Sequence, residues 1–268
     1  MKFWNRLIYY GLSIFEILFG MRNGLSLIPL FLRKSSGAKH QVQLWKPPIR
    51  LNIRGAMDVW AVKETFLDAF YTRYGVQVED GWTVVDIGAG IGDFSILAAY
   101  SKPRTVVYAF EPFRESYQLM LENLTLNEIN NVYAFQKAVW RESGTLMLDL
   151  SGKEPLQIAS RDLADQANGE GVVQAMTLAD ILTQHDLKTV DLLKLDCEGA
   201  EYAILMETSG RDLVQIHRII MEYHDLDEVR QNLALKTFLE GEGYTVTLHE
   251  NCVHDDIGYL FAQRLSAG

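Results

Sequence analysis

The side chains best able to do chemistry gather directly after one apolar run of the chain. Residues 190–195 are predicted to form a buried strand, and Lys194, Asp196, Glu198 and Glu201 lie at its end and just beyond it. Side chains alternate along a strand, so Lys194, Asp196 and, if the chain stays extended, Glu198 point the same way. So many ionisable groups are costly in a core and natural in a cleft. We therefore expect a functional role for Asp196 and Glu198, whereas Glu201 is expected to begin the next helix at a solvated strand end.

A second polar pair follows the next predicted strand, residues 218–223. Glu222 and His224 share one face of that strand at its carboxyl end, beside the first cluster. His224 is our first candidate for a general base because imidazole titrates near neutral pH, and Asp196 is the second. A capped surface position for His224 is equally consistent with the sequence. In an alternative mechanism, Asp196, Glu222 and His224 bind a divalent cation that chelates a diol and lowers the pKa of its hydroxyl.

A glycine-rich turn follows an earlier apolar run. Residues 83–87 predict a buried strand, and the sequence then passes through Gly88, Gly90 and Gly92 into an apolar helical segment. Glycines permit positive φ and leave room for a ligand against bare backbone at the end of a strand. A dinucleotide fingerprint has a small residue where this chain has Asp93, which disfavours a nicotinamide cofactor.

An acidic residue follows the next predicted strand at the separation that nucleoside-binding folds require. The run 105–110 ends at Glu111, nineteen residues after the last glycine of the turn. An acid at this position accepts hydrogen bonds from ribose hydroxyls in such folds, so Glu111 is predicted to do so here. A third strand over 132–135 places Gln136 and Lys137 where an adenine edge would be read.

The composition limits the partners and the compartment. The chain has 268 residues and a net charge of −10, which suits one large α/β domain and disfavours a nucleic-acid partner. A small-molecule acceptor fits better. Cys197 and Cys252 have no zinc or redox spacing and are consistent with a reducing compartment, so we expect a cytoplasmic protein.

The first 32 residues form a separate amphipathic segment with a broad apolar face. Glu16, Arg22 and Asn23 interrupt it, so a spanning helix is not expected, and a signal peptide is a poor match. Two interpretations stay open. The helix packs on the domain or on a second subunit of a homo-oligomer, or it lies on a membrane as a peripheral contact with Lys2, Arg6 and Arg22 near the headgroups.

The remaining pattern divides the chain into residues 1–55, an N-terminal helix and linker, and residues 56–268, the main domain. The elements expected along it are a linker over 33–55 with a short strand at 49–53, a helix from Val59 to Tyr74 ended by Gly75, an exposed strand at 145–150, a mobile loop at 151–171, a helix at 227–240 and two antiparallel strands at 244–249 and 258–263.

These motifs together resemble the FkbM family of S-adenosylmethionine-dependent methyltransferases. The segments VVDIGAGIGDFSILAA, AFEP, LLKLDCEGAEYAIL and IIMEYH carry the resemblance, which covers roughly residues 56–263. One departure is Gly90, where the family often has Asn. The resemblance implies an α/β fold of class I, or Rossmann-like, methyltransferases, with a seven-stranded mostly parallel sheet and helices on both faces. The alternating strands and helices independently favour this architecture.

The resemblance also implies a function and a set of site residues. It implies methyl transfer from S-adenosylmethionine, in our interpretation to a hydroxyl of a sugar, glycolipid or secondary metabolite. The alternatives are a nicotinamide-dependent oxidoreductase and a non-catalytic membrane-associated partner. The residues expected at the cofactor are Asp86, Gly88, Ala89, Gly90, Gly92, Glu111, Pro112, Gln136 and Lys137, and those expected in catalysis are His224, Asp196, Glu222 and Glu198.

Overall fold

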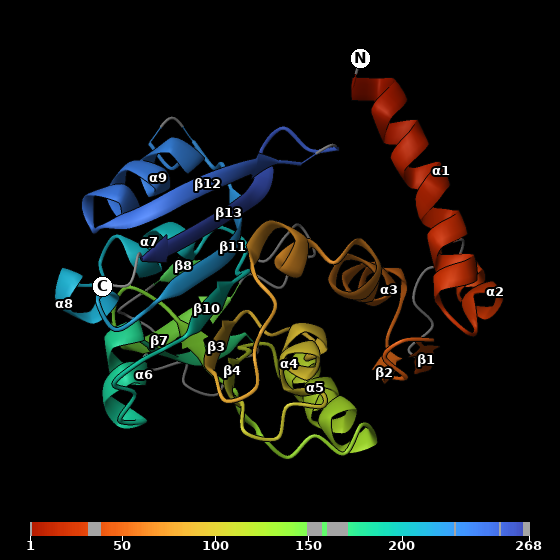
Figure 1. Ribbon diagram of the computed structural model, residues 1–268, viewed down its shortest axis with the longest axis horizontal. Coiled ribbons are helices and arrows are strands. Elements are labelled where there is room, and N and C mark those ends of the chain that lie inside the picture. Colours follow the sequence, from red (N-terminus) through yellow and green to blue (C-terminus); the bar gives the residue numbers. More distant parts are fainter. Residues whose placement is uncertain are drawn as a thin grey trace.

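A seven-stranded sheet forms the centre of the molecule (Figure 1). The structure is a computed structural model that describes residues 2–31, 39–148, 157–159, 171–227, 229–251 and 253–264. The strand order is β12-β13-β11-β10-β3-β4-β5. The strands are β3 (Thr83–Ile87), β4 (Val106–Phe110), β5 (Val132–Phe135), β10 (Leu192–Leu195), β11 (Arg218–His224), β12 (Tyr244–Glu250) and β13 (Ile257–Arg264).

The strand directions confirm the predicted fold class. The five strands from β5 to β11 run parallel to one another, whereas β13 pairs antiparallel with both β11 and β12. The carboxyl ends of β3, β4, β10 and β11 therefore lie at one edge of the sheet. Ligands bind at this edge in open α/β sheets.

Helices cover both faces of the sheet because its central strands are apolar on both sides. One face packs against α6 (Leu178–Gln184), α7 (Glu201–Leu205), α8 (Gly210–Leu213) and α9 (Asn232–Gly241). The other packs against α3 (Ala56–Lys63), α4 (Asp93–Ala99) and α5 (Arg114–Leu126). The helix expected over 227–240 begins later than predicted, at Asn232.

A small second sheet follows β5 and was not predicted. Its strand order is β6-β9-β7-β8, and its strands are β6 (Ala138–Val139), β7 (Gly144–Leu148), β8 (Gln157–Ala159) and β9 (Val172–Met176). β7 matches most of the strand expected at 145–150. Most of the loop expected at 151–171 lies outside the described residues, and the described part, β8, pairs with β7.

The segment before α3 is folded onto the main domain. It contains α1 (Lys2–Gly20), α2 (Gly24–Leu27), the 3-10 turn η1 (Ile28–Phe31) and the antiparallel pair β1 (His40–Gln43) and β2 (Arg50–Ile53). The expectation of a linker before residue 49 was therefore wrong for β1. Val42 and Leu51 are buried in one core cluster with Ile91 and Met120, because the pair lies against α5.

The helix expected from Val59 to Tyr74 is interrupted. α3 is followed by two wide, π-type turns, η2 (Glu64–Asp68) and η3 (Tyr71–Gly75), with left-handed backbone at Ala69 between them. Such turns are frequent at functional sites because they change the direction of side chains. Here they direct Glu64 and Tyr71 to the ligand edge of the sheet.

Candidate active site

The glycine turn after β3 lies against the turn after β10. A Cβ on Gly88 would come within 1.8 Å of the Asp196 carbonyl oxygen, and its φ is +73°. Glycine is therefore required for this close approach. A Cβ on Gly90 would instead meet nothing within 4 Å, since this glycine lines an open cavity.

Glu111 at the end of β4 joins this turn to the next strand. The Gly90 N–H donates to Glu111 Oε2 and the Phe113 N–H to Glu111 Oε1, each at 2.8 Å. The residue is only 4% exposed. Burial raises the pKa of Glu111 to about 7, against the opposing effect of the two N–H donors. Each oxygen retains a further lone pair that can accept a hydroxyl from a ligand.

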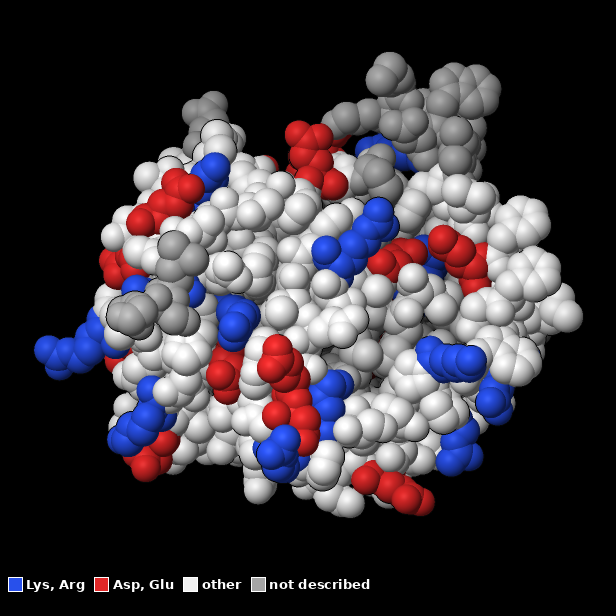
Figure 2. All heavy atoms as spheres, in the orientation of Figure 1, with Lys and Arg blue, Asp and Glu red and all other residues white. Residues whose placement is uncertain are grey.

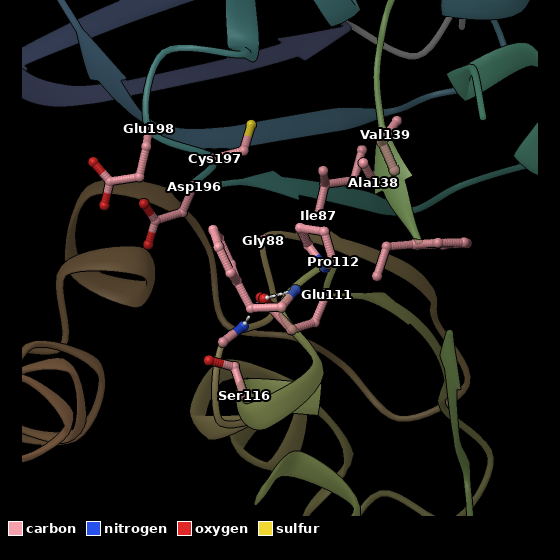
Figure 3. Close-up of a pocket in the computed structure, with 13 residues that line it drawn as sticks. Ile87, Gly88, Glu111, Pro112, Ser116, Ala138, Val139, Asp196, Cys197 and Glu198 are labelled. Carbon is pink, nitrogen blue, oxygen red and sulfur yellow. Dashed lines mark hydrogen bonds between the residues drawn. The ribbon is translucent and has the colours of Figure 1, made fainter. Parts of the chain in front are cut away.

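A cavity of about 230 Å³ lies beside these two turns (Figure 3). Asp196 and Glu198 project at one end of it, Ala138 and Val139 lie at the other, and Glu111 lies between them. The cavity therefore has an acidic end, a carboxylate in the middle and an apolar end.

The apolar end differs from the sequence prediction. Ala138 and Val139 line the cavity, and Gln136 and Lys137 are not among its lining residues. The Lys137 N–H bonds back to the Phe135 carbonyl at 3.0 Å, and the next two residues then pair with β9 as β6. This tight turn brings small apolar side chains to the position that the sequence indicated for polar ones.

The other residues predicted at the cofactor divide into lining and supporting positions. Gly88, Gly90 and Pro112 line the cavity with Glu111. Asp86, Gly92 and Ala89 support the turn without lining the cavity. Asp86 accepts a 2.6 Å hydrogen bond from Ser95 Oγ, and Gly92 lies against Met120. The Ala89 N–H donates to the Phe110 carbonyl. Asp86 is fully buried, so it stabilises the glycine turn from within the core and does not contact the cavity.

A second cavity of about 130 Å³ adjoins the first, with Gly88, Gly90 and Asp196 lining both. Its walls are polar and come from the segments before and after β3. Glu64, Thr65 and Tyr71 come from η2 and η3. The helix expected over 59–74 was interpreted as closing over the cofactor pocket or as a plain packing helix, but its apolar spacing did not single out these side chains. Arg54, Asp58, Asp93 and Lys194 complete the polar lining.

Lys194 supplies the positive charge of this region. It is 3% exposed, its Nζ donates to the Gly88 carbonyl at 2.8 Å, and it lies 3.1 Å from Asp86 Oδ1 and 3.9 Å from Asp196 Oδ2. Burial alone lowers the pKa of Lys194, but the surrounding aspartates outweigh this effect and raise it. The ammonium group is therefore charged at neutral pH and stabilises the glycine turn and Asp196 together.

The acidic side chains of Glu64 and Asp93 line the polar cavity, and Glu222 is near enough to Asp196 for their charges to interact. Burial raises the pKa of Glu64 to about 8 and that of Asp93 to about 6. Burial, followed by the charges of Asp196 and Glu64, raises the pKa of Glu222 well above its ordinary value. Burial is the largest cause of each shift, so these carboxyl groups ionise less readily than in water, and a positively charged ligand would stabilise their ionised forms.

Asp196 occupies the position common to both cavities. The Tyr71 hydroxyl donates to Asp196 Oδ2 at 2.7 Å, and the Asp196 N–H bonds to the Ile87 carbonyl at 3.0 Å. The backbone bond fixes the turn after β10 against β3, and the tyrosine orients the carboxylate. Asp196 therefore has both a fixed position and access to the cavities.

His224 lies among three carboxylates. Its Nε2 is 3.4 Å from Glu198 Oε2 and 3.7 Å from Glu222 Oε1, and its Nδ1 is 3.7 Å from Glu201 Oε1. Glu198 reaches this position with φ of +53°, so the chain does not stay extended after Asp196. Glu201 begins α7 as expected, but it is fully buried, so the expectation that it is solvated was wrong.

The protonation of His224 changes our preferred base. Burial alone lowers the pKa of His224, but Glu201 and Glu198 outweigh burial and raise it to about 10. An imidazolium ion has no free lone pair and accepts no proton. The raised pKa of His224 makes Asp196 our first candidate for the base, the reverse of the order that the sequence indicated.

Comparison with known proteins gives the family. A profile of the methyltransferase FkbM domain matches residues 86–246, which is more than half of the chain. The chain belongs to this family. The FkbM domain thus includes the glycine turn, Glu111, Asp196 and His224, and membership supports methyl transfer that depends on S-adenosylmethionine.

Individual relatives agree with the family assignment. The FkbM-family chain is 26% identical over 217 residues to the 31-O-demethyl-FK506 methyltransferase FkbM of Streptomyces tacrolimicus, covering 70% of this chain and 82% of that one. It is 28% identical over 214 residues to methyltransferase sdnD of Sordaria araneosa, covering 69% and 81%. The crystal structure of methyltransferase FkbM from Methylobacillus flagellatus KT has a similar fold, with a TM-score of 0.50 at 16% identity over 76% of this chain and 53% of that chain.

The FkbM-family site also bears on the metal alternative. Among the residues that the structure describes, no group of three or more His, Cys, Asp or Glu side chains is arranged to hold a metal ion. Asp196, Glu222 and His224 were the ligands considered from the sequence. They lie near one another, but the imidazole of His224 forms ion pairs with carboxylates instead.

The residues of the first cavity fit S-adenosylmethionine. Gly90 leaves open space where a side chain would otherwise stand, and Glu111 offers acceptors for vicinal hydroxyls. Ala138 and Val139 offer apolar contacts to a flat ring. Asp196 and Glu198 place negative charge at the other end, which suits a sulfonium cation.

Proposed function

We propose that this FkbM-family protein is an O-methyltransferase that uses S-adenosylmethionine to methylate a hydroxyl of a small molecule, in the class of sugars, glycolipids and secondary metabolites. One observation carries the proposal: the Asp196 carboxylate lines both the cavity that fits the cofactor and the adjoining polar cavity. A base at such a junction can reach a hydroxyl that meets the methyl group. The name of the Streptomyces relative, which refers to an O-methyl position, agrees with an oxygen acceptor.

In the proposed reaction, the bound cofactor supplies an electrophilic methyl group, and the protein provides alignment and proton removal. Glu111 accepts the ribose hydroxyls, while the Gly88–Gly90 turn leaves room for the methionine portion. Asp196 would take the proton from the acceptor hydroxyl as the new carbon–oxygen bond forms and the bond from the methyl carbon to the sulfonium sulfur breaks, which leaves S-adenosylhomocysteine. The proton would then pass from Asp196 to solvent. Tyr71 holds the carboxylate in place throughout through its 2.7 Å hydrogen bond.

Lys194 and His224 have supporting roles in this proposal. Both are cations at neutral pH and offset the charge of the surrounding carboxylates. Lys194 Nζ is 3.9 Å from Asp196 Oδ2 and forms an ion pair with that carboxylate. His224 Nε2 lies 3.4 Å from Glu198 Oε2 and 3.7 Å from Glu222 Oε1 and holds these two side chains near each other.

The test is an assay with radiolabelled S-adenosylmethionine and extracts of the source cell, with the labelled product identified afterwards. Replacement of Asp196 by Asn should lower kcat about 10²–10⁴-fold, the range for loss of a general base. Binding of S-adenosylhomocysteine, measured by calorimetry, should change little. Asp186→Asn, a surface carboxylate paired with Lys188, is the matched control. Wild-type turnover by the Asp196 variant would refute its role as base.

Calorimetry also distinguishes the competing functions. The family match favours methyl transfer over the nicotinamide-dependent oxidoreductase. Binding of S-adenosylhomocysteine without NADH binding is the expected result, and the reverse would overturn the proposal. Binding of neither compound would support the non-catalytic partner.

A further inference from the structure

The first two helices expose an unusually apolar surface. We call this surface the N-terminal flank, and it comprises the exposed side chains of Tyr10, Leu12, Ile14, Phe15, Phe19 and Leu25. Phe19 is 75% exposed and Leu25 is 80% exposed. Trp45 in the turn between β1 and β2, and Met57 at the start of α3, are exposed as well. Large apolar side chains gathered in this way mark an interaction surface.

The exposed apolar side chains of the N-terminal flank are not needed to pack α1 on the domain. α1 already buries a separate row, Ser13 and Ile17, which continues to Met21, against the domain. Apolar residues therefore occupy both the buried and the open faces of α1, a pattern that calls for a second apolar environment. None of the described helices is long and apolar enough to cross a membrane.

Charge distinguishes this end of the chain from the rest. Residues 1–50 contain eight Lys or Arg residues and one acidic residue, Glu16, which gives a net charge of +7. The net charge of the whole chain is −10, so the net charge of residues 51–268 is −17. The single acid is itself paired, because Lys63 Nζ lies 2.9 Å from Glu16 Oε2. Basic charge and apolar surface thus coincide in the N-terminal region of an otherwise acidic protein.

Basic side chains border the flank itself. The guanidinium of Arg22 lies 5.1 Å from the centre of the Trp45 ring, and both residues are exposed, as is Lys46. Figure 2 shows the side of the molecule where α1 and α2 lie as mostly uncharged, with basic side chains just below it. Aromatic and basic residues beside an apolar helix face are typical of the interface between lipid headgroups and acyl chains.

We propose that the N-terminal flank binds the surface of an anionic lipid bilayer, with α1 lying in the plane of the interface. A second copy of the chain fits less well, because a two-fold interface would bring two flanks of the same positive charge together. An anionic bilayer satisfies both features, since acyl chains take up the apolar side chains and headgroups attract the basic ones.

The flank is also close to the site. Tyr9 of α1 packs edge-to-face on Trp60 with ring centroids 5.8 Å apart, and Trp60 Nε1 donates to Glu64 at 2.9 Å. Glu64 lines the polar cavity. Test variants are therefore placed on the open face of α1, away from Tyr9 and Trp60, so that a loss of lipid binding is separate from any change in the site.

The experiment is co-sedimentation of the full chain with vesicles of phosphatidylcholine alone or mixed with phosphatidylglycerol. We expect binding at least about tenfold stronger to the anionic vesicles, weakened by high salt. The double variant Phe15→Glu/Phe19→Glu should lose at least about tenfold in binding. Val214→Glu/Leu233→Glu changes two exposed apolar residues on other elements and is the matched control, expected to bind as the wild type does.

Two further measurements make the result decisive. Arg22→Glu/Lys46→Glu should abolish the preference for anionic vesicles, and thermal unfolding of every variant should match the wild type because these side chains are exposed. Absence of vesicle binding by the wild type would overturn the proposal. So would equal binding to both kinds of vesicle, or a dimer in light scattering that the Phe15/Phe19 variant dissociates while vesicle binding is absent.

Discussion

At the scale of single residues, the site contains several acidic side chains whose pKa values are raised toward neutral pH. Burial raises the pKa of Glu111 to about 7, of Glu64 to about 8 and of Asp93 to about 6. Such shifts cluster at functional sites because a ligand, rather than water, is needed to stabilise the charged forms. The environment therefore favours a cationic ligand even though Lys194 is already present.

Glu111 makes the first prediction. If its carboxylate accepts ribose hydroxyls, the affinity for S-adenosylhomocysteine should increase as the pH rises through about 7, where the carboxyl ionises. Glu111→Gln should bind about 10–100-fold more weakly near pH 8, with little dependence on pH. Calorimetry between pH 6 and pH 8 measures both effects. Glu115→Gln, at an exposed position on α5, is the control, and unaltered binding by the Glu111 variant would refute the role.

His224 makes the second prediction. Its pKa in the folded protein is about 10, above the ordinary 6.5, so its contribution to stability is complete below pH 6.5 and is lost as the pH rises through about 10. His224→Gln should therefore reduce the free energy of unfolding by about 3 kcal/mol more at pH 6 than at pH 10. Urea unfolding at the two pH values gives the difference. The exposed His254→Gln serves as the control, and an equal loss at both pH values would contradict the assignment.

At the scale of elements, the site depends on two turns that touch. The turn after β3 and the turn after β10 meet at Gly88, and the interrupted helix after α3 adds Glu64 and Tyr71. The two turns are in contact because β3 and β10 pair in parallel, which places the carboxyl ends of both strands side by side. The chemistry therefore resides in loops held by a rigid sheet.

Gly88→Ala tests that contact. Its Cβ would come within 1.8 Å of a backbone oxygen, so the turns must separate. We expect a loss of about 3 kcal/mol or more in stability and of detectable cofactor binding. Gly81→Ala is the matched control, since Gly81 also has positive φ but has nothing within 4 Å of an added Cβ. It should cost about 1 kcal/mol and leave binding intact. Thermal unfolding and calorimetry measure the pair, and equal effects of the two changes would contradict the argument.

At the scale of the whole molecule, the N-terminal segment shares its core with the domain. Asn123 of α5 links the parts: Asn52 N–H donates to its Oδ1 at 2.6 Å, and its Nδ2 donates to the Ile91 carbonyl at 2.9 Å. The β1–β2 pair, the glycine turn and α5 are thus joined through one buried amide. Figure 1 shows α1 extending along the outer side of this assembly.

Asn123→Ala should therefore destabilise the whole molecule rather than one part. Its loss leaves the Asn52 N–H and the Ile91 carbonyl without their partner, at a cost of about 2–3 kcal/mol. Tm should fall by about 5–10 °C in a single transition. Asn130→Ala, at an exposed position, should change Tm little. Two separate transitions in the calorimetric scan would show that the N-terminal segment unfolds independently.

The sequence alone indicated the α/β class, the family, the glycine turn, Glu111 and the acidic cluster after β10. These features follow from local patterns, since a buried run, a glycine turn or an acid after a strand is visible within a few neighbouring residues. Asp196 was among the candidates for this reason, but its place at the junction of two cavities was not visible.

Only the tertiary structure decided which side chains meet. It showed Glu64 and Tyr71 at the site, because an interrupted helix has the same apolar spacing as a continuous one. It also showed that Ala138 and Val139 line the cavity where Gln136 and Lys137 were expected, because a tight turn after β5 moves the lining position two residues along the chain. Our proposal of Asp196 rather than His224 as the base also depends on the tertiary structure, because burial and the charges of neighbouring residues distant in sequence set the pKa of His224.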